Sequence, residues 1–157
     1  MAKITMKGIF PAPIDKVWRV LHMHRDEATA IHPDILSQRI VSEEGEAAYK
    51  DLTFKTTIVF EREWRFGGKP WMSTWQYTQS PPERLRIELL GGDEPFAVGS
   101  YWENTYSEVS RGTLILTKGE MIFRDLKAPK FLQGWAVRRG MSQADKEDLN
   151  YLRRTNL

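Results

Sequence analysis

Arg62 is the residue whose type and position most directly suggest chemistry. By strand alternation it shares a face with Trp64 and Phe66, which we assign to the interior. A buried Arg needs a carboxylate or an anionic ligand to compensate its charge, so an interior Arg62 would present a rigid fork of donors to an acidic ligand. The alternative, favoured by the rarity of fully buried charges, is that Arg62 reaches water or pairs with Glu103 or Glu120.

Asn104 is a second polar candidate, because alternation places it on one face with Trp102 and Tyr106. Aromatic residues are the strongest compositional signal, with six Trp in 157 residues. They either fill a core or line a pocket in which a few polar groups orient a small molecule. The residues alone favour neither interpretation. The set comprises Trp64, Phe66, Trp71, Trp75, Tyr77, Phe96, Trp102, Tyr106 and Trp135.

The histidines His22, His24 and His32 are the candidates for metal binding. A helical zinc site uses ligands at i and i+4, whereas His22 and His24 are two apart and diverge. The chain has no Cys, which excludes disulfides, Cys-ligated metals and a thiol nucleophile. Phosphate-binding loops, nucleophile elbows and His-Glu-x-x-His motifs do not occur. We expect no metal and no cofactor.

Alternating apolar and polar residues predict about seven strands that must position these side chains. The predicted strands are Lys3–Phe10, Ile35–Glu43, Ala48–Phe66, Trp71–Gln79, Arg84–Leu90, Ser100–Val109 and Thr113–Arg124. Two short helices follow the first strand, one over Ile14–Leu21 and a weaker one over His22–His32. The loop Gly91–Gly99 carries Phe96 and is expected to form the entrance of any cavity.

The last long stretch, Pro129–Arg154, predicts a helix of about six or seven turns. Its apolar stripe begins with Phe131, Leu132 and Trp135, and we predict that Trp135 projects toward the sheet. Glu147 is assigned to the solvent side, together with the basic residues of the helix. An amphipathic helix of this kind needs a partner surface. The order of elements therefore predicts one α+β domain over residues 1–157, in which a curved antiparallel sheet wraps around this helix.

Composition limits the partners. Apolar content of 41% and charged content of 28% are those of a globular protein, and the formal net charge of +2 does not suggest nucleic-acid binding. No apolar run is long enough to span a membrane, and a signal-peptide core is lacking. We expect a cytoplasmic protein that is a monomer or a weak homodimer.

Residues Phe10 to Leu21, with the pattern Pro11-x-Pro13-x-x-x-Val17-Trp18-x-x-Leu21, resemble the START-like superfamily. This superfamily, also called SRPBCC, includes Bet v 1, polyketide cyclases and coenzyme Q-binding proteins, and the resemblance covers nearly the whole chain. It implies the helix-grip fold, with a cavity between the sheet and the last helix that holds a hydrophobic molecule or lipid. Plant members carry a Gly-rich loop where this chain has Glu43-Glu44-Gly45-Glu46, so that loop is not carried over.

The resemblance favours a cavity over a solid core. It assigns a ligand-binding role to Arg62, Trp64, Phe66, Trp75, Tyr77, Phe96, Trp102, Asn104, Tyr106, Leu132 and Trp135. The first functional interpretation is a carrier or sensor for a hydrophobic or aromatic small molecule. The second is a cyclase, aromatase or dehydratase acting on a polyketide-like ligand, with Arg62, Asn104 and Glu103 moving protons. A third is a protein-interaction module that uses an exposed apolar patch.

Overall fold

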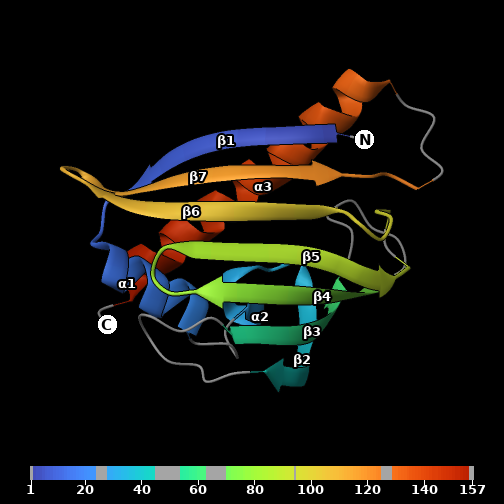
Figure 1. Ribbon diagram of the computed structural model, residues 1–157, viewed down its shortest axis with the longest axis horizontal. Helices are drawn as coiled ribbons and strands as arrows, with labels where there is room; N and C mark the ends of the chain where they lie inside the picture. The colour runs from blue at the N-terminus through green and yellow to red at the C-terminus, as the bar shows by residue number, and fades with distance from the viewer. Residues whose placement is uncertain are drawn as a thin grey trace.

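The computed structural model describes residues 2–23, 28–44, 54–62, 70–93, 95–124 and 129–155. Figure 1 shows a curved sheet with a long helix across one face. The first elements are β1 (Ala2–Phe10), α1 (Ile14–Trp18), the π-helical turn η1 (Arg19–Met23), α2 (Ala28–Ile31), β2 (Ile35–Glu44) and β3 (Phe54–Arg62). The remaining elements are β4 (Trp71–Ser80), β5 (Arg84–Gly92), β6 (Tyr101–Val109), β7 (Gly112–Met121) and α3 (Lys130–Arg154).

The seven strands form one antiparallel sheet in the order β1-β7-β6-β5-β4-β3-β2. The strands from β2 to β7 follow one another as a meander. β1 completes the sheet beside β7, with Ala2 opposite Met121 and Phe10 opposite Thr113. The single helix α3 runs diagonally behind the sheet (Figure 1). The predicted α+β helix-grip architecture is confirmed.

The segment from β1 to η1 anchors one end of the core. Val17, Trp18 and Val20 are completely buried, and the ring of Trp18 meets Tyr106 edge-on with centroids 5.3 Å apart. Thr113 Oγ1 donates a 2.8 Å hydrogen bond to the Ala12 carbonyl oxygen, which fixes the chain as it leaves β1. The predicted first helix is therefore present, and its Val17-Trp18 pair packs under the sheet.

The rotation of α3 differs from the prediction. Phe131, Leu132 and Trp135 are 72%, 44% and 55% exposed, so the prediction that Trp135 projects toward the sheet is wrong. Gly134 and Val137 are buried instead, on the stripe that packs along β1. A Cβ at Gly134 would meet only the Arg138 side chain, at 3.8 Å, so this contact with β1 does not require a glycine. Trp135 lies on the outer side of this contact, where its ring is 5.4 Å from the guanidinium of Arg139.

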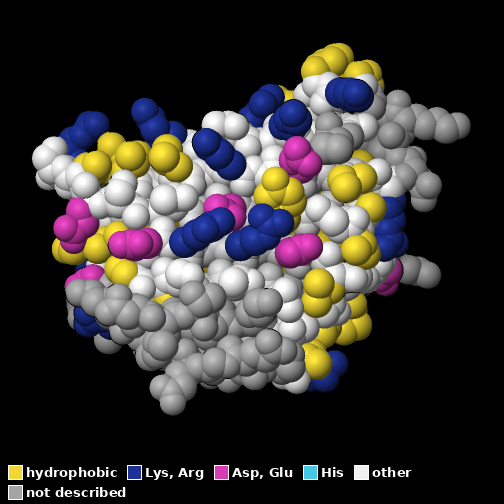
Figure 2. Space-filling model, viewed as in Figure 1, with side chains coloured by type: hydrophobic (Ala, Val, Ile, Leu, Met, Phe, Trp, Pro, Cys, Tyr) yellow, Lys and Arg dark blue, Asp and Glu magenta, His cyan; other side chains and the backbone are white. Residues whose placement is uncertain are grey.

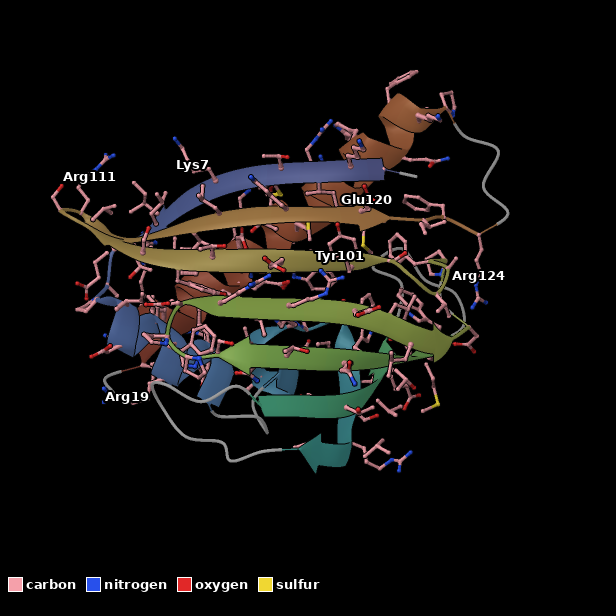
Figure 3. The ribbon with its side chains drawn as sticks, in the orientation of Figure 1. Lys7, Arg19, Tyr101, Arg111, Glu120 and Arg124 are labelled. Carbon is pink, nitrogen blue, oxygen red and sulfur yellow. The ribbon has the colours of Figure 1, made fainter. Side chains whose placement is uncertain are left out.

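The outer face of the sheet is charged and faces solvent. Figure 2 shows basic and acidic side chains interspersed on it, and Figure 3 places Lys7, Tyr101 and Glu120 on the strands of this face. Glu103 accepts a 2.8 Å hydrogen bond from Arg84 and lies 3.6 Å from Arg86. Because Glu103 alternates with the inward-facing Asn104, it is on the wrong side of the sheet for the proton-transfer role that the second interpretation gave it.

Several predicted boundaries change. The last strand ends at Met121, although the prediction continued it to Arg124. Within the predicted helix His22–His32, the structure has η1 to Met23 and α2 from Ala28 to Ile31. The outer parts of the predicted strand Ala48–Phe66 lie outside the described residues.

Candidate ligand-binding cavity

A cavity of about 440 Å³ lies between the inner face of the sheet and α3. Its volume is within the range of about 300–1,000 Å³ that is usual for small-molecule sites. Strands β1 to β7 contribute to the lining, and α2 and α3 cover it from the other side. The aromatic residues of the lining are Trp71, Trp75, Tyr77, Phe96, Trp102 and Phe123.

Two aromatic pairs build the apolar end of the cavity. Trp75 and Trp102 meet at 62° with centroids 5.2 Å apart, and Trp75 Nε1 donates a 2.8 Å hydrogen bond to Ser73 Oγ. Phe96 and Phe123 lie beyond the ends of β5 and β7, with centroids 4.8 Å apart. The hydrogen bond satisfies the indole N–H, so the Trp75 ring presents only apolar surface to a ligand.

A row of polar side chains crosses the sheet at the other end. Gln79 on β4 is opposite Leu85, Leu85 is opposite Asn104, and Asn104 is opposite Thr117 on β7. Thr117 Oγ1 donates to Asn104 Oδ1 at 2.8 Å, and Asn104 Nδ2 donates to the Tyr106 hydroxyl at 3.2 Å. Gln79 is 3% exposed, and its Oε1 has no hydrogen-bond partner among the described residues.

Acidic side chains also line the cavity, on α3 and in the turn before β2. Asp34, Asp145, Glu147 and Asp148 line the cavity together with His32. His32 Nε2 is 3.3 Å from Asp148, and His32 Nδ1 is 3.7 Å from Glu147. Glu147 is 8% exposed, so its assignment to the solvent side of the helix is wrong.

The environment changes the proton affinity of two groups at this end. Packing around the Asp145 carboxyl group raises its pKa to about 6, the neighbouring charge of Asp148 adds to the rise, and His32 opposes it. Asp145 lies at the rim, where part of its surface remains exposed. Burial raises the pKa of Tyr106, the hydrogen bond from Asn104 opposes the rise, and Asp148 and Asp145 add to it. Asp145 and Asp148 line the same cavity as Asn104 of the polar row.

The predicted site residues fall into three groups. Trp75, Tyr77, Phe96, Trp102 and Asn104 line the cavity. Tyr106 is buried behind Asn104, while Leu132 and Trp135 are exposed and away from the cavity. The side chain of Arg62, and Trp64 and Phe66 entirely, lie outside the described part of the structure. Only the backbone of Arg62 is placed, opposite Ile35 and Trp71.

The sequence prediction missed most of the polar lining. Gln79 could have been found from the sequence, since it lies two and four residues after Tyr77 and Trp75 and therefore on the same face of the strand. Asp145 and Asp148 follow Met141 at helical spacing, but the wrong rotation of the helix concealed them. His32 and Asp34 had no local signal that would place them beside α3. No group of three or more His, Cys, Asp or Glu side chains that suits a metal occurs within the described residues.

A second hollow, of about 460 Å³, is a shallow groove between the start of β1 and the first turns of α3. It is lined by Ala2, Lys3, Lys130, Phe131, Gly134 and Arg138. The aromatic cavity has the enclosing walls of a small-molecule site, whereas the groove is open and lined by basic side chains. None of the helices that the structure describes has the length and apolar character needed to cross a membrane.

The fold has many counterparts among solved structures. A START superfamily protein from Mycobacterium smegmatis superposes with a TM-score of 0.78 and 11% identity, over 98% of this chain and 99% of that one. Ara h 8.0201 superposes with a TM-score of 0.73 and 16% sequence identity, over 98% of both chains. The Zhui aromatase/cyclase from Streptomyces sp. R1128 superposes with a TM-score of 0.68 and 16% sequence identity, over 96% of this chain and 90% of that one.

The chain also matches the di-domain aromatase/cyclase StfQ of the steffimycin pathway, with a TM-score of 0.72 and 8% identity, and it spans 49% of that chain. No family model matches the sequence. No curated protein matches it either. The backbone superposes on these solved structures over 96% to 98% of this chain. The chain has the START-like helix-grip fold.

Proposed function

We propose that the protein binds a hydrophobic or aromatic small molecule in the cavity between the sheet and α3, as a carrier or sensor. The observation that carries the proposal is the cavity itself, about 440 Å³ in volume and lined at one end by Trp71, Trp75, Trp102 and Phe96. An apolar cavity of this size with a few polar groups at one end encloses and orients a small molecule.

Binding without covalent chemistry is supported by the hydrogen bonds of the polar row. The hydroxyl group of Thr117 donates to the Asn104 amide oxygen, which cannot act as a general base. A nucleophilic hydroxyl group needs an adjacent base to activate it. The described polar row therefore orients a ligand through fixed hydrogen bonds.

Filling the cavity from α3 tests the proposal. A side chain added at Gly140 points into open space, since no heavy atom lies within 4 Å of the position that its Cβ would take, and Gly140 lines the cavity. Gly140→Phe should abolish the fluorescence increase of the neutral probe N-phenyl-1-naphthylamine. Ser142→Phe is the control, because Ser142 is exposed on the opposite side of the same helix turn. Equal probe binding by both variants and wild type would place binding elsewhere.

A cyclase-type enzyme is the second candidate function. Its support is the proximity of His32 to Asp148 at 3.3 Å inside the same cavity, since a His–carboxylate pair can move protons on a bound ligand. Several solved structures of this fold are described as aromatase/cyclases. Native mass spectrometry of protein from its own host would identify a retained molecule. Incubating that molecule with fresh protein distinguishes the two functions, because an enzyme yields a new product and a carrier returns the molecule unchanged.

A further inference from the structure

The two ends of the cavity differ in chemistry, and this difference restricts the ligand. Trp75 and Gln79 lie on the same face of β4, four residues and therefore about 13 Å apart. Trp75 belongs to the aromatic end and Gln79 to the polar row. A ligand that fills the cavity thus places its apolar body against the Trp75–Trp102 pair and one end against the polar row.

The polar end is rich in acceptors. Asp34, Asp145, Glu147 and Asp148 supply carboxylates. His32 lies between Glu147 and Asp148, whereas no ion pair or hydrogen bond joins Asp145 to another described residue. The described lining residues include no Lys and no Arg. Among the described residues, the charged groups at this end are therefore mainly acidic.

Gln79 provides an independent observation at the same end. It is 3% exposed, it lines the cavity, and its Oε1 has no hydrogen-bond partner among the described residues. A buried acceptor without a donor costs free energy, and a ligand N–H group would satisfy it. A second buried acceptor, Gln38 Oε1, also lacks a partner among the described residues and lines the cavity, but it lies opposite Phe60 and hence in the row of Ser73, on the far side of Trp75 from Gln79. At the polar end, Gln79 Oε1 is therefore an acceptor to which a ligand can donate a hydrogen bond.

We propose that the cavity selects an organic cation, an aromatic or alicyclic amine whose protonated nitrogen faces Asp145 and Gln79 while its ring lies against Trp75 and Trp102. This inference rests on the proposed function. Ammonium–carboxylate hydrogen bonds are among the stronger ones in proteins, and indole faces also attract cations. Carboxylic acids of the same shape are rejected, because their charge meets Asp145 and Asp148.

The test is isothermal titration calorimetry with three probes of similar shape: 2-(1-naphthyl)ethylamine, 2-(1-naphthyl)ethanol and 3-(1-naphthyl)propanoate. Wild type at pH 8 should bind the amine at least about tenfold more tightly than the alcohol, the usual worth of one charge-assisted hydrogen bond. The propanoate should bind more weakly than the alcohol. Asp145→Asn should remove most of the preference for the amine while the affinity for the alcohol stays the same.

Two further variants complete the experiment. Gln79→Met keeps the length of the side chain and removes its hydrogen-bond acceptor. It should therefore weaken binding of the amine more than binding of the alcohol. Glu108→Gln is the matched control, since it deletes one negative charge at an exposed position that does not line the cavity. It should leave all three affinities unchanged.

The outcomes separate the two proposals. Binding of the alcohol that Gly140→Phe abolishes, without preference for the amine, keeps the proposed function and overturns the cation selectivity. Tighter binding of the propanoate also overturns it, and would support the anion-recognising role expected of Arg62. A preference for the amine that Asp145→Asn and Glu108→Gln reduce equally is a long-range effect of net charge, and overturns the assigned site. No binding of any naphthyl probe or of N-phenyl-1-naphthylamine overturns both proposals.

Discussion

His32 Nε2 lies 3.3 Å from Asp148, so the end of α2 is tied to the last third of α3 at the polar end of the cavity. We expect this contact to stabilise the closed arrangement of the two helices. His32→Gln should lower the free energy of unfolding by about 1–2 kcal/mol, within the usual range for loss of a partly buried polar contact. Urea denaturation at pH 6 measures it.

A double-mutant cycle isolates the pair itself. The double variant His32→Gln, Asp148→Asn should lose less free energy of unfolding than the sum of the losses in the two single variants. The difference, which is the coupling energy of the pair, should be at least about 0.5 kcal/mol. Additive costs would mean that His32 and Asp148 do not interact in solution.

Asp145 should make the stability depend on pH. Its pKa is raised to about 6 in the folded protein, against an ordinary value of about 3.9 in an unfolded chain. Between these values the folded state binds more protons, so this group lowers stability as the pH rises toward 6. Asp145→Asn should therefore raise the melting temperature at pH 8 and have little effect at pH 4.

The neighbours of Asp145 define the control for this prediction. Asp148 and His32 influence its charge, and Asp34 and Glu147 line the same cavity. Repeating the melts at pH 6, where an imidazole ordinarily carries charge, in the His32→Gln background should make the benefit of Asp145→Asn larger than in wild type, because the positive charge of His32 favours the ionised Asp145. Equal benefits at pH 4 and pH 8 would show that the ionisation of Asp145 is not responsible.

Trp135 and Trp18 should differ sharply in their contribution to stability. Trp135 is 55% exposed, and Trp18 is fully buried. Trp18→Ala should cost about 3–5 kcal/mol, as large aromatic deletions in a core do. Trp135→Ala should cost less than about 1 kcal/mol, because few packing contacts are lost. Similar costs for the two variants, measured by urea denaturation, would place Trp135 in the core.

Gly119 and Gly140 should respond in opposite directions to an added methyl group. A Cβ at Gly119 would lie 2.7 Å from Trp102 Cα and 2.8 Å from Trp102 Cβ, so Gly119→Ala should cost about 1–3 kcal/mol through overpacking. Gly140→Ala meets open space and should stabilise α3 by about 1 kcal/mol through helix propensity. Thermal melts of both variants check the pair, and destabilisation by Gly140→Ala would indicate that this side of the cavity is closed.

The loop between β5 and β6 should respond to a ligand. Pro95 and Phe96 line the cavity, and backbone hydrogen bonds from Ala97 to Ile122 and from Arg124 to Pro95 attach the loop to the end of β7. Hydrogen exchange with saturating N-phenyl-1-naphthylamine should show added protection at residues 95–99. Protection only at α2 and the second half of α3 would place the entrance at the polar end.

The sequence by itself determined the order of elements and the aromatic wall. In a strand the side-chain period is two, so once Trp75 is assigned inward, Tyr77 follows, and Asn104 follows Trp102 in the same way. The Val17-Trp18 pair identified the buried start of the fold. These features are local, and alternation within one strand predicts them without knowledge of the segments that pack against that strand.

Only the tertiary structure decided the polar end and the rotation of α3. Two adjacent stripes of that helix are apolar or small, one through Leu132 and Trp135 and the other through Gly134 and Val137, and periodicity does not separate them. The choice depends on which stripe packs against β1, a contact between the two ends of the chain that buries Val137 and Gly134. The same rotation places Asp145 and Asp148 in the lining of the cavity and brings Asp148 to His32, an association between segments far apart in the chain that no local pattern specifies.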